Sequence, residues 1–319
     1  MDPLAGSPVF VVPHHGDNPM AWEFLRRTVH SLLGQSLDRW RAVIVDDASP
    51  DADAADRLAA VVALDPDRLH VLRGSRNQGP GGARNEGVRW AAARSAPYVL
   101  FQDADDLADP DRLARTEREF REHPDTGFVY SAFEVIDEHD KPVPREEITP
   151  SVLEILDALA AGPVRGRDGW LRIGTVTGYA TLTSTVSVRT DLALRHPFPH
   201  TRVSEDAHTW FRMLADGTDL GFLPDVTAGY RIPRSTSGSA SRERLGGDFY
   251  SLMLLVDLDG FLAALSAALE AGRLTAPQAR EAVRGFHLRQ ARTMAAEGHV
   301  AAAEVCRALA APGADTDPF

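Results

Sequence analysis

A chain of 319 residues is long enough for one large α/β unit with an appended region, and it can bury a core without disulfides. The formal net charge of −12 argues against a nucleic-acid partner, because such proteins present a basic face to phosphates. No run approaches the roughly 20 apolar residues of a membrane span, so no span is expected. The first residues predict no secretory signal, and one cysteine, Cys306, fits a reducing cytoplasm.

Short apolar runs alternate with helical patterns in the N-terminal third, which is typical of βαβ units and a mainly parallel sheet. The predicted strands are 9–12, 42–45, 69–72 and 98–102. Pro13 is expected to end the first strand, and a helix with an apolar face from Trp22 to Leu33 follows it. A second helix reaches about Val62. The glycines of 79–82 are expected to form a tight turn before a helix over 84–93.

The alternation is weaker in the second half of the chain. The strands and helices expected there cover 128–131, 152–161, 181–188, 206–215 and 220–223. After a loop rich in Ser and Gly the pattern becomes helical, with apolar faces over 249–256 and 261–269. A further helix starts at Pro277 and ends at Gly298. We therefore expect a helical C-terminal extension.

Three acids, Asp103, Asp105 and Asp106, directly follow the predicted strand 98–102. Ligands of open α/β sheets collect beyond the carboxyl ends of strands, and gathered carboxylates gain from binding a hard divalent cation. The motif therefore predicts a Mg²⁺ or Mn²⁺ site. An acidic helix N-terminus is the other interpretation.

A second acidic pair, Asp46 and Asp47, ends an earlier predicted strand and should open onto the same edge of the sheet. A carboxylate there can accept hydrogen bonds from a ribose hydroxyl or from N3–H of uracil. An Asx-type turn is the other interpretation. The glycine-rich run NQGPGGARN matches neither the dinucleotide-binding nor the P-loop pattern, so it predicts no phosphate loop.

The order of these motifs resembles the family 2 glycosyltransferases of the GT-A fold. The segments that carry the resemblance are VFVVP, VIVDDAS, RNQGPGGARNEG, FQDADD and VSEDAHTWFRML. The resemblance covers roughly Pro8 to Arg231 and implies an α/β fold with a GT-A domain, a Rossmann-like nucleotide-diphospho-sugar transferase, over 8–233. It divides that domain into a nucleotide-binding half, 8–106, and an acceptor half, 107–233. It does not reach 234–319, where we expect a lid segment and the helical extension.

The same resemblance implies roles for individual residues. Asp47 would recognise the base, Asp103 would lie near the ribose, and Asp105 would hold Mg²⁺ or Mn²⁺ on the diphosphate. The other residues implied to contact the nucleotide are Pro13, His15, Arg76, Arg84 and Arg231.

Several of these positions have plainer interpretations. His15 stands where relatives often carry a tyrosine, and its ring could stack on a pyrimidine, but His14 and His15 could also be exposed loop histidines. Arg76 and Arg84 could be simple surface arginines. Relatives often carry a histidine after a YRx stretch, where this chain has Pro233, so the full metal shell stays open.

Glu205 and Asp206 begin a predicted helix. An inverting transfer needs a base that takes the proton of the acceptor hydroxyl, and a positioned carboxylate suits that task. The resemblance assigns the base to Asp206 and leaves Glu205 to orient the helix start or the acceptor. A helix N-cap at Ser204 with acids in its first turn is the other interpretation. Trp210 would line the acceptor site or belong to the core.

These observations predict an inverting transferase that moves a sugar from a nucleoside-diphosphate sugar to an unidentified acceptor hydroxyl or other nucleophile. UDP is favoured by resemblance, and dTDP and GDP stay open. A nucleotidyltransferase on a related fold, a noncatalytic nucleotide-sugar-binding protein and an interaction protein on a former glycosyltransferase fold stay open. A homodimer through the C-terminal helices is a further expectation.

Overall fold

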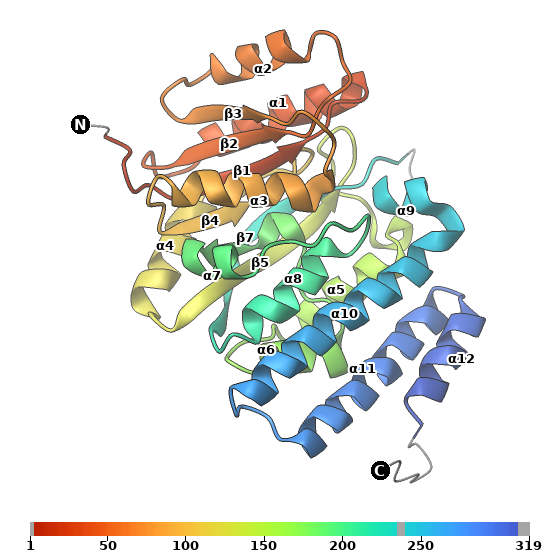
Figure 1. Cartoon of the computed structure of the whole chain (residues 1–319). Coiled ribbons are helices and arrows are strands. Elements are labelled where there is room, and N and C mark those ends of the chain that lie inside the picture. The colour runs from red at the N-terminus through yellow and green to blue at the C-terminus, as the bar shows by residue number, and fades with distance from the viewer. Residues whose placement is uncertain (1–2, 235–239, 312–319) are drawn as a thin grey trace.

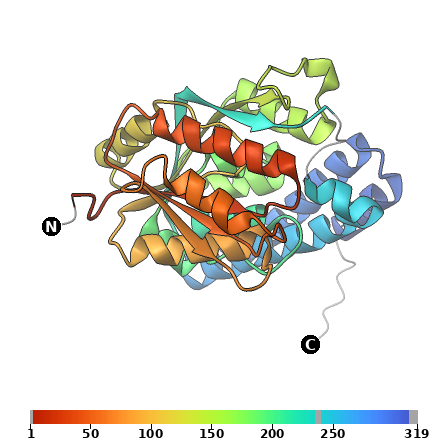
Figure 2. The same ribbon diagram turned by 90° about the horizontal axis from the view of Figure 1, so that it is seen from above.

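The computed structural model of the chain describes residues 3–234 and 240–311. In these residues seven strands form one sheet in the order β3-β2-β1-β4-β6-β5-β7, with helices on both faces (Figures 1 and 2). The strands are β1 (Val9–His14), β2 (Arg41–Asp46), β3 (Leu69–Arg73), β4 (Tyr98–Phe101), β5 (Thr126–Ile136), β6 (Ser187–Arg189) and β7 (Asp219–Arg231). Strand β6 is antiparallel to β4 and β5, and the remaining pairings are parallel. The carboxyl ends of all strands except β6 therefore meet at one edge, as expected for the α/β fold.

The helices form a layer on each face of the sheet. Apolar side chains of α1 (Pro19–Leu33), α2 (Ala54–Val62) and α4 (Arg112–Glu122) share one core with the sheet. The opposite core contains side chains of α3 (Gly79–Ala92), α6 (Gly169–Arg172), α7 (Thr190–Arg195), α8 (Glu205–Leu214), α10 (Phe249–Glu270) and α11 (Ala276–Ala296). The remaining helices are α5 (Pro150–Ala161), α9 (Ala240–Leu245) and α12 (Val300–Leu309).

Helix α1 confirms the predicted amphipathic pattern. The side chain of Asn18 accepts a hydrogen bond from the backbone N–H of Ala21, and Pro19 occupies the first turn, where its missing N–H costs nothing. The buried face is Trp22, Phe24, Leu25, Thr28, Val29 and Leu32, and Gly34 follows the last turn. In contrast, no helix was expected over α4, whose residues are mostly polar or charged.

Pro13 does not end the first strand, contrary to expectation. Strand β1 continues to His14, where it still pairs with Asp46 of β2. The N–H of Gln102 bonds the carbonyl of Val11, so Val11 and Pro13 both face β4. Pairing with β4 has ended at Val11, and the missing N–H of Pro13 therefore costs no ladder hydrogen bond.

The expected turn over 79–82 is also wrong, because these residues form the first turn of α3. Further along α3, a Cβ on Gly87 would lie 2.3 Å from Cγ1 of Val11, so the helix packs closely on β1 at this point. A glycine there serves helix-to-sheet packing.

Two strand predictions in the second half need correction. The region 181–188 contains a short 3-10 helix, η3 (Thr183–Thr185), before the three residues of β6. Strand β7 does not stop before Pro224. Its register against β5 jumps from Leu223 to Thr227, so a bulge on this edge strand accommodates the proline, and pairing resumes to Arg231.

The two predicted C-terminal apolar faces belong to the single helix α10, and α11 and α12 follow beside it (Figure 1). The most apolar window of 18 residues within Gly246–Glu270 has a mean hydropathy of 1.9, so by length and composition this helix could cross a membrane, contrary to the expectation that no run comes near that length. Of its most apolar window, 39% is buried inside the protein, including Phe261 and Leu265 in the main core. The Ser- and Gly-rich segment expected to act as a lid includes 235–239, which lie outside the described residues.

Candidate active site

Acidic side chains converge at the carboxyl edge of the sheet. Asp47 follows β2, Asp103 and Asp105 follow β4, and Asp206 lies in the first turn of α8. Desolvation, followed by the negative charges of Asp106, Asp105, Asp103 and Asp206, raises the pKa of Tyr230, a partly buried residue near the end of β7. Because all these charges act on one phenol, three separate parts of the chain, after β4, at the start of α8 and near the end of β7, lie close together.

The three acids of the DADD motif have different environments. The carboxylate of Asp106 is buried and accepts hydrogen bonds from the Ser184 hydroxyl (2.5 Å) and the Arg231 backbone N–H (2.8 Å). The Thr28 hydroxyl donates to the carbonyls of Ala104 and Asp106 at 2.9 and 2.8 Å. Asp106 thus fixes the loop. The loop is not a helix N-terminus, because α4 begins only at Arg112.

Asp105 is the acid left available to a ligand. It is exposed at the protein surface, and among the described residues no other side chain or backbone group donates a hydrogen bond to its carboxylate. Desolvation by the surrounding protein, followed by the negative charge of Asp103, raises the pKa of Asp105 to about 6. A carboxylate in such a position gains from a nearby cation.

Arg84 joins the DADD motif to the start of α8. Its guanidinium donates to Oδ1 of Asp103 and to Oε1 of Glu205, both at 2.7 Å, and its side chain is only 4% exposed. Burial lowers the pKa of Arg84, but the charges of Asp103 and Glu205 outweigh it and raise that pKa above its ordinary value. Arg84 is therefore a buried charged bridge, and the surface interpretation does not apply.

The two acids at the end of β2, Asp46 and Asp47, have different hydrogen-bond partners. Oδ1 of Asp46 accepts from the N–H and hydroxyl of Ser49, as in an Asx-type turn. The buried carboxylate of Asp47 accepts the backbone N–H groups of Gln78 (2.7 Å) and Gly79 (2.8 Å) at the start of α3. A carboxylate has about four acceptor positions, so Asp47 retains capacity for a further donor.

Residues after β1 and β3 lie beside Asp47. Nδ1 of His15 lies 3.0 Å from the carbonyl oxygen of Asp47 and 3.4 Å from Nδ2 of Asn77. Pro13 is half-buried at the end of β1, and Arg76 is exposed in the loop before α3. His14, by contrast, is buried against the ring of Trp22, and burial lowers its pKa to about 4. It is not an exposed loop histidine.

The ED pair begins α8 in an unusual way. Ser204 has a left-handed φ of 56° and makes no side-chain cap, so the N-cap interpretation does not hold. Oδ2 of Asp206 accepts from the Thr183 hydroxyl at 3.3 Å, and Oδ1 accepts from Ala207 N–H at 2.8 Å. The left-handed conformation of a residue such as Ser204 costs about 1 to 2 kcal/mol of conformational free energy, so contacts around it must hold Glu205 and Asp206 in place.

Arg231 lies behind the DADD loop instead of facing outward. Its guanidinium donates to the backbone carbonyls of Asp105 and Asp137, both at 2.6 Å, and it pairs with Asp140. Its carbon atom Cζ lies 4.5 Å from the ring centroid of Phe24. The side chain is fully buried, so these contacts orient the backbone at Asp105.

Sequence reasoning missed three residues of the site. Thr183 contacts Asp206. Ser184 contacts the DADD loop, because its hydroxyl accepts the N–H of Asp103 (2.9 Å) and donates to Asp106. Tyr230 faces the acids from β7. The cluster of hydroxyl residues at 181–187 and the YR pair were the available signals. Trp210 instead packs in the core against the rings of Phe101, Phe128 and Phe198.

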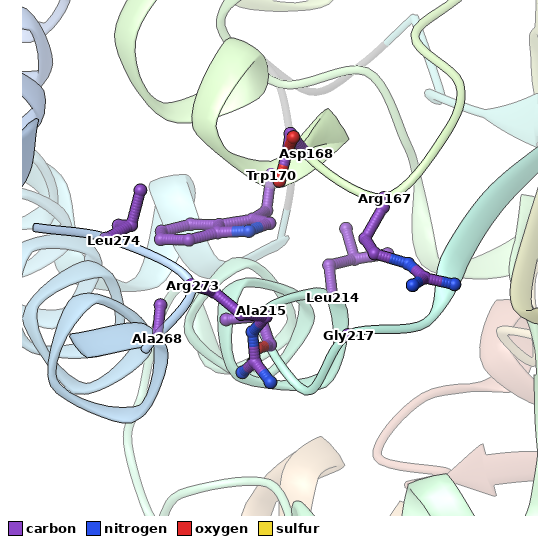
Figure 3. A pocket seen from close by; sticks show the side chains of 9 residues that line it. All are labelled: Arg167, Asp168, Trp170, Leu214, Ala215, Gly217, Ala268, Arg273 and Leu274. Carbon is purple, nitrogen blue, oxygen red and sulfur yellow. The ribbon is translucent and has the colours of Figure 1, made fainter. Parts of the chain in front are cut away.

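A pocket elsewhere on the molecule is separate from these acids. Figure 3 shows its lining residues from α6, α8, α10 and the segments beside them: Arg167, Asp168, Trp170, Leu214, Ala215, Gly217, Ala268, Arg273 and Leu274. Arg167 pairs with Asp219 at the start of β7. Because β7 ends at the carboxyl edge, this pocket lies toward the opposite edge of the sheet.

Comparisons with known proteins agree with this arrangement. The family model described as Glycosyl transferase family 2 matches residues 9–189. A putative teichuronic acid biosynthesis glycosyltransferase, TuaG of Bacillus subtilis, is 27% identical over 219 residues, which cover 69% of this chain and 78% of that protein.

Two solved structures share the fold. S. aureus TarS in complex with UDP-GlcNAc has a TM-score of 0.55 at 17% identity, covering 95% of this chain and 90% of that one. The mannosyltransferase PcManGT from Pyrobaculum calidifontis, in complex with GDP-Man and Mn²⁺, has a TM-score of 0.52 at 17% identity, covering 95% and 87%. The family match spans more than half of the chain and includes the DADD loop. This chain belongs to glycosyl transferase family 2 and has the GT-A fold.

Proposed function

We propose that this protein transfers a sugar, with inversion, from a nucleoside-diphosphate sugar to an acceptor hydroxyl or other nucleophile, and that it requires Mg²⁺ or Mn²⁺. The observation that carries the proposal is the presence of two acids from different elements, the available carboxylate of Asp105 and that of Asp206, near Tyr230. One acid serves the donor side and the other the acceptor side. Arg84 links the two sides, because its guanidinium donates hydrogen bonds to Asp103 and to Glu205.

A divalent cation fits the residues at the DADD loop. The carboxylate of Asp105 is exposed and takes no hydrogen bond from another described residue, and Asp103 lies close enough to raise its pKa. Among the described residues no three acids, histidines or cysteines are grouped to enclose a metal. Mg²⁺ and Mn²⁺ are often held by one or two carboxylates plus phosphates, so Asp105, with Asp103 nearby, would hold the cation. Such a cation would neutralise charge on the departing diphosphate.

The protein's own groups would bind the nucleotide and move the proton. We assign Asp47 to the base or ribose, with His15 and Pro13 beside it, and Arg76 to the donor as an exposed cation. Asp206 would take the proton of the acceptor as the new bond forms, while Thr183 orients its carboxylate. UDP is the preferred nucleotide by family resemblance, and the TarS complex with UDP-GlcNAc supports that choice.

Product analysis tests this function directly. The protein is incubated with UDP-glucose, UDP-galactose or UDP-GlcNAc and Mn²⁺, and the released nucleotide is identified by chromatography. We expect slow release of UDP with water as acceptor. Formation of UTP in a parallel incubation with added pyrophosphate would indicate a nucleotidyltransferase instead. Binding without turnover would indicate a noncatalytic nucleotide-sugar-binding protein, and no binding would indicate an interaction protein.

We also propose that two copies pair through α10. Leu255, Leu262 and Leu269 are spaced seven residues apart and are 65%, 44% and 37% exposed. A seven-residue apolar repeat is the pattern of a helix seam, and α10 contains no Lys or Arg to attract an anionic membrane surface. Light scattering should give the mass of a dimer, and Leu255→Lys with Leu262→Lys should give a monomer. A monomeric parent protein contradicts this proposal.

Residues 8–233 form the proposed catalytic region, with a nucleotide half, 8–106, and an acceptor half, 107–233. Residues 234–319 would supply the lid and the helical region. Since Phe261 and Phe286 lie in the main core, removal of everything after 233 should leave that core open. We expect such a truncated chain to lose its cooperative thermal transition. A truncated chain as stable as the full chain would contradict the expected contribution of 234–319 to the core.

A further inference from the structure

The segment before η3 is held mainly by side chains from the C-terminal helices. Among the described residues, Tyr179, Ala180 and Thr181 make no backbone-to-backbone hydrogen bond. This segment, residues 173–182, begins with a π-helix, η2 (Ile173–Thr177), and continues through Gly178, whose φ is 78°. Departures from regular hydrogen bonding of this kind often occur at functional sites.

Two buried polar residues of α10 and α11 contact this segment. The hydroxyl of Tyr179 donates to Oδ2 of Asp257, which also accepts from Nε2 of Gln290 at 3.0 Å. Nε of Arg289 donates to the carbonyl of Gly174 at 3.0 Å, and its Cζ lies 5.4 Å from the ring centroid of Tyr179. Asp257 and Arg289 are 0% and 1% exposed.

Backbone packing fixes the same segment. A Cβ on Gly174 would lie 2.4 Å from Cε2 of Phe261, and a Cβ on Gly285 would lie 3.0 Å from Cβ of Thr175. A Cβ on Gly178 would lie 2.2 Å from Oε1 of Glu154. The segment therefore packs closely against α5, α10 and α11 at these three glycines.

The end of this segment leads to Thr183, which contacts Asp206. The next residue, Ser184, is held independently, because it bonds the DADD loop and because β6 pairs with β4 directly after it. Displacement of the segment should therefore move Thr183 more than Ser184. Such a displacement would change the position of Asp206 on the acceptor side and would leave the DADD loop on the donor side in place.

We propose that Asp257 and Arg289 are positioning residues for the acceptor side of the reaction, acting through Tyr179 and the segment 173–182 on Thr183 and Asp206. This inference rests on the proposed function. It gives the C-terminal helices, which the family match does not cover, a role in the transfer step.

The test uses the full chain and UDP-glucose, UDP-galactose and UDP-GlcNAc as probes, with water as acceptor. Tyr179→Phe removes the hydroxyl, and Asp257→Leu removes its acceptor at similar size. Asp257→Asn keeps an oxygen that can accept the hydroxyl. Tyr250→Phe is the matched control, because it removes a hydroxyl on α10 that bonds Glu297 and no residue of the segment.

We expect Tyr179→Phe and Asp257→Leu to lower kcat for UDP release at least fivefold. Their Kd for UDP with Mn²⁺, measured by calorimetry, should stay within twofold of the parent value. Asp257→Asn and Tyr250→Phe should keep kcat within twofold. An unchanged kcat in Tyr179→Phe, an equal fall in Tyr250→Phe, or a fall accompanied by weaker UDP binding overturns the inference. A parent protein that turns over none of these donors contradicts the proposed function, and with it this inference.

Discussion

The guanidinium of Arg84 spans Asp103 at the end of β4 and Glu205 at the start of α8, with 2.7 Å to each carboxylate. Removal of one partner of a buried ion pair typically costs about 3 to 5 kcal/mol, because the remaining charge stays buried without compensation. We therefore expect Arg84→Ala to lower the free energy of unfolding by about that amount, measured by urea denaturation.

Arg89→Ala provides the matched control for Arg84. Arg89 lies on the same helix and pairs with Glu86, but its side chain is 57% exposed. Exposed pairs contribute about 0.2 to 1 kcal/mol, so this variant should change the free energy of unfolding little. Equal losses in Arg84→Ala and Arg89→Ala would show that the bridge does not hold the two acids in place. Should Arg84→Ala not fold, Arg84→Lys, which cannot reach both carboxylates in the same fork geometry, gives the comparison.

Asp105→Asn should abolish the Mn²⁺ dependence of UDP binding, because an amide keeps the size of the side chain but lacks the charge that a hard cation requires. Asp111→Asn, an exposed position shortly after in the chain, is the control and should bind as the parent does. Calorimetry with and without Mn²⁺ measures both. Unaltered Mn²⁺-dependent binding in Asp105→Asn would exclude Asp105 as the metal ligand.

Metal-dependent binding should also weaken in acid. The pKa of Asp105 is raised to about 6, and a metal ligand must be deprotonated, so the Mn²⁺-dependent part of UDP affinity should fall as pH decreases from 7 to 5. The same titration of Asp105→Asn should be flat over that range. A parent affinity independent of pH between 5 and 7 would contradict the assigned ligand.

Some of this site could be predicted from local sequence and some could not. The acids after β2 and β4 follow apolar runs, and a few neighbouring residues in the sequence are enough to predict where such a strand ends. The continuation of β1 through Pro13 was not visible, because it depends on where β4 stops pairing. The bridge of Arg84 to Glu205 connects residues far apart in the chain, and neither neighbourhood indicates its partner. Thr183 was missed for the same reason.

The pH dependence of stability should reveal Asp257. Burial raises the pKa of this carboxyl from its ordinary 3.8 to about 7, so the folded state binds more protons than the unfolded state between those values. Its contribution to stability is present below about pH 4 and is lost as pH rises through 7. Asp257→Asn remains neutral, so its free energy of unfolding relative to the parent should rise from pH 4 to 7 and then level. A constant difference across that range would mean that Asp257 is not titrating there.

The measurement closest to the central claim is single-turnover release of UDP from a saturating UDP-sugar with Mn²⁺, with the parent protein, Asp206→Asn and Glu205→Gln compared. If Asp206 is the base, Asp206→Asn should lower the rate by about 10² to 10⁴ while UDP affinity and its Mn²⁺ dependence stay unchanged. Glu205→Gln should reduce the rate less, since its carboxylate contacts Arg84. Near-parental rates in Asp206→Asn with a large loss in Glu205→Gln would move the base to Glu205. Near-parental rates in both variants would contradict base catalysis by this acid pair.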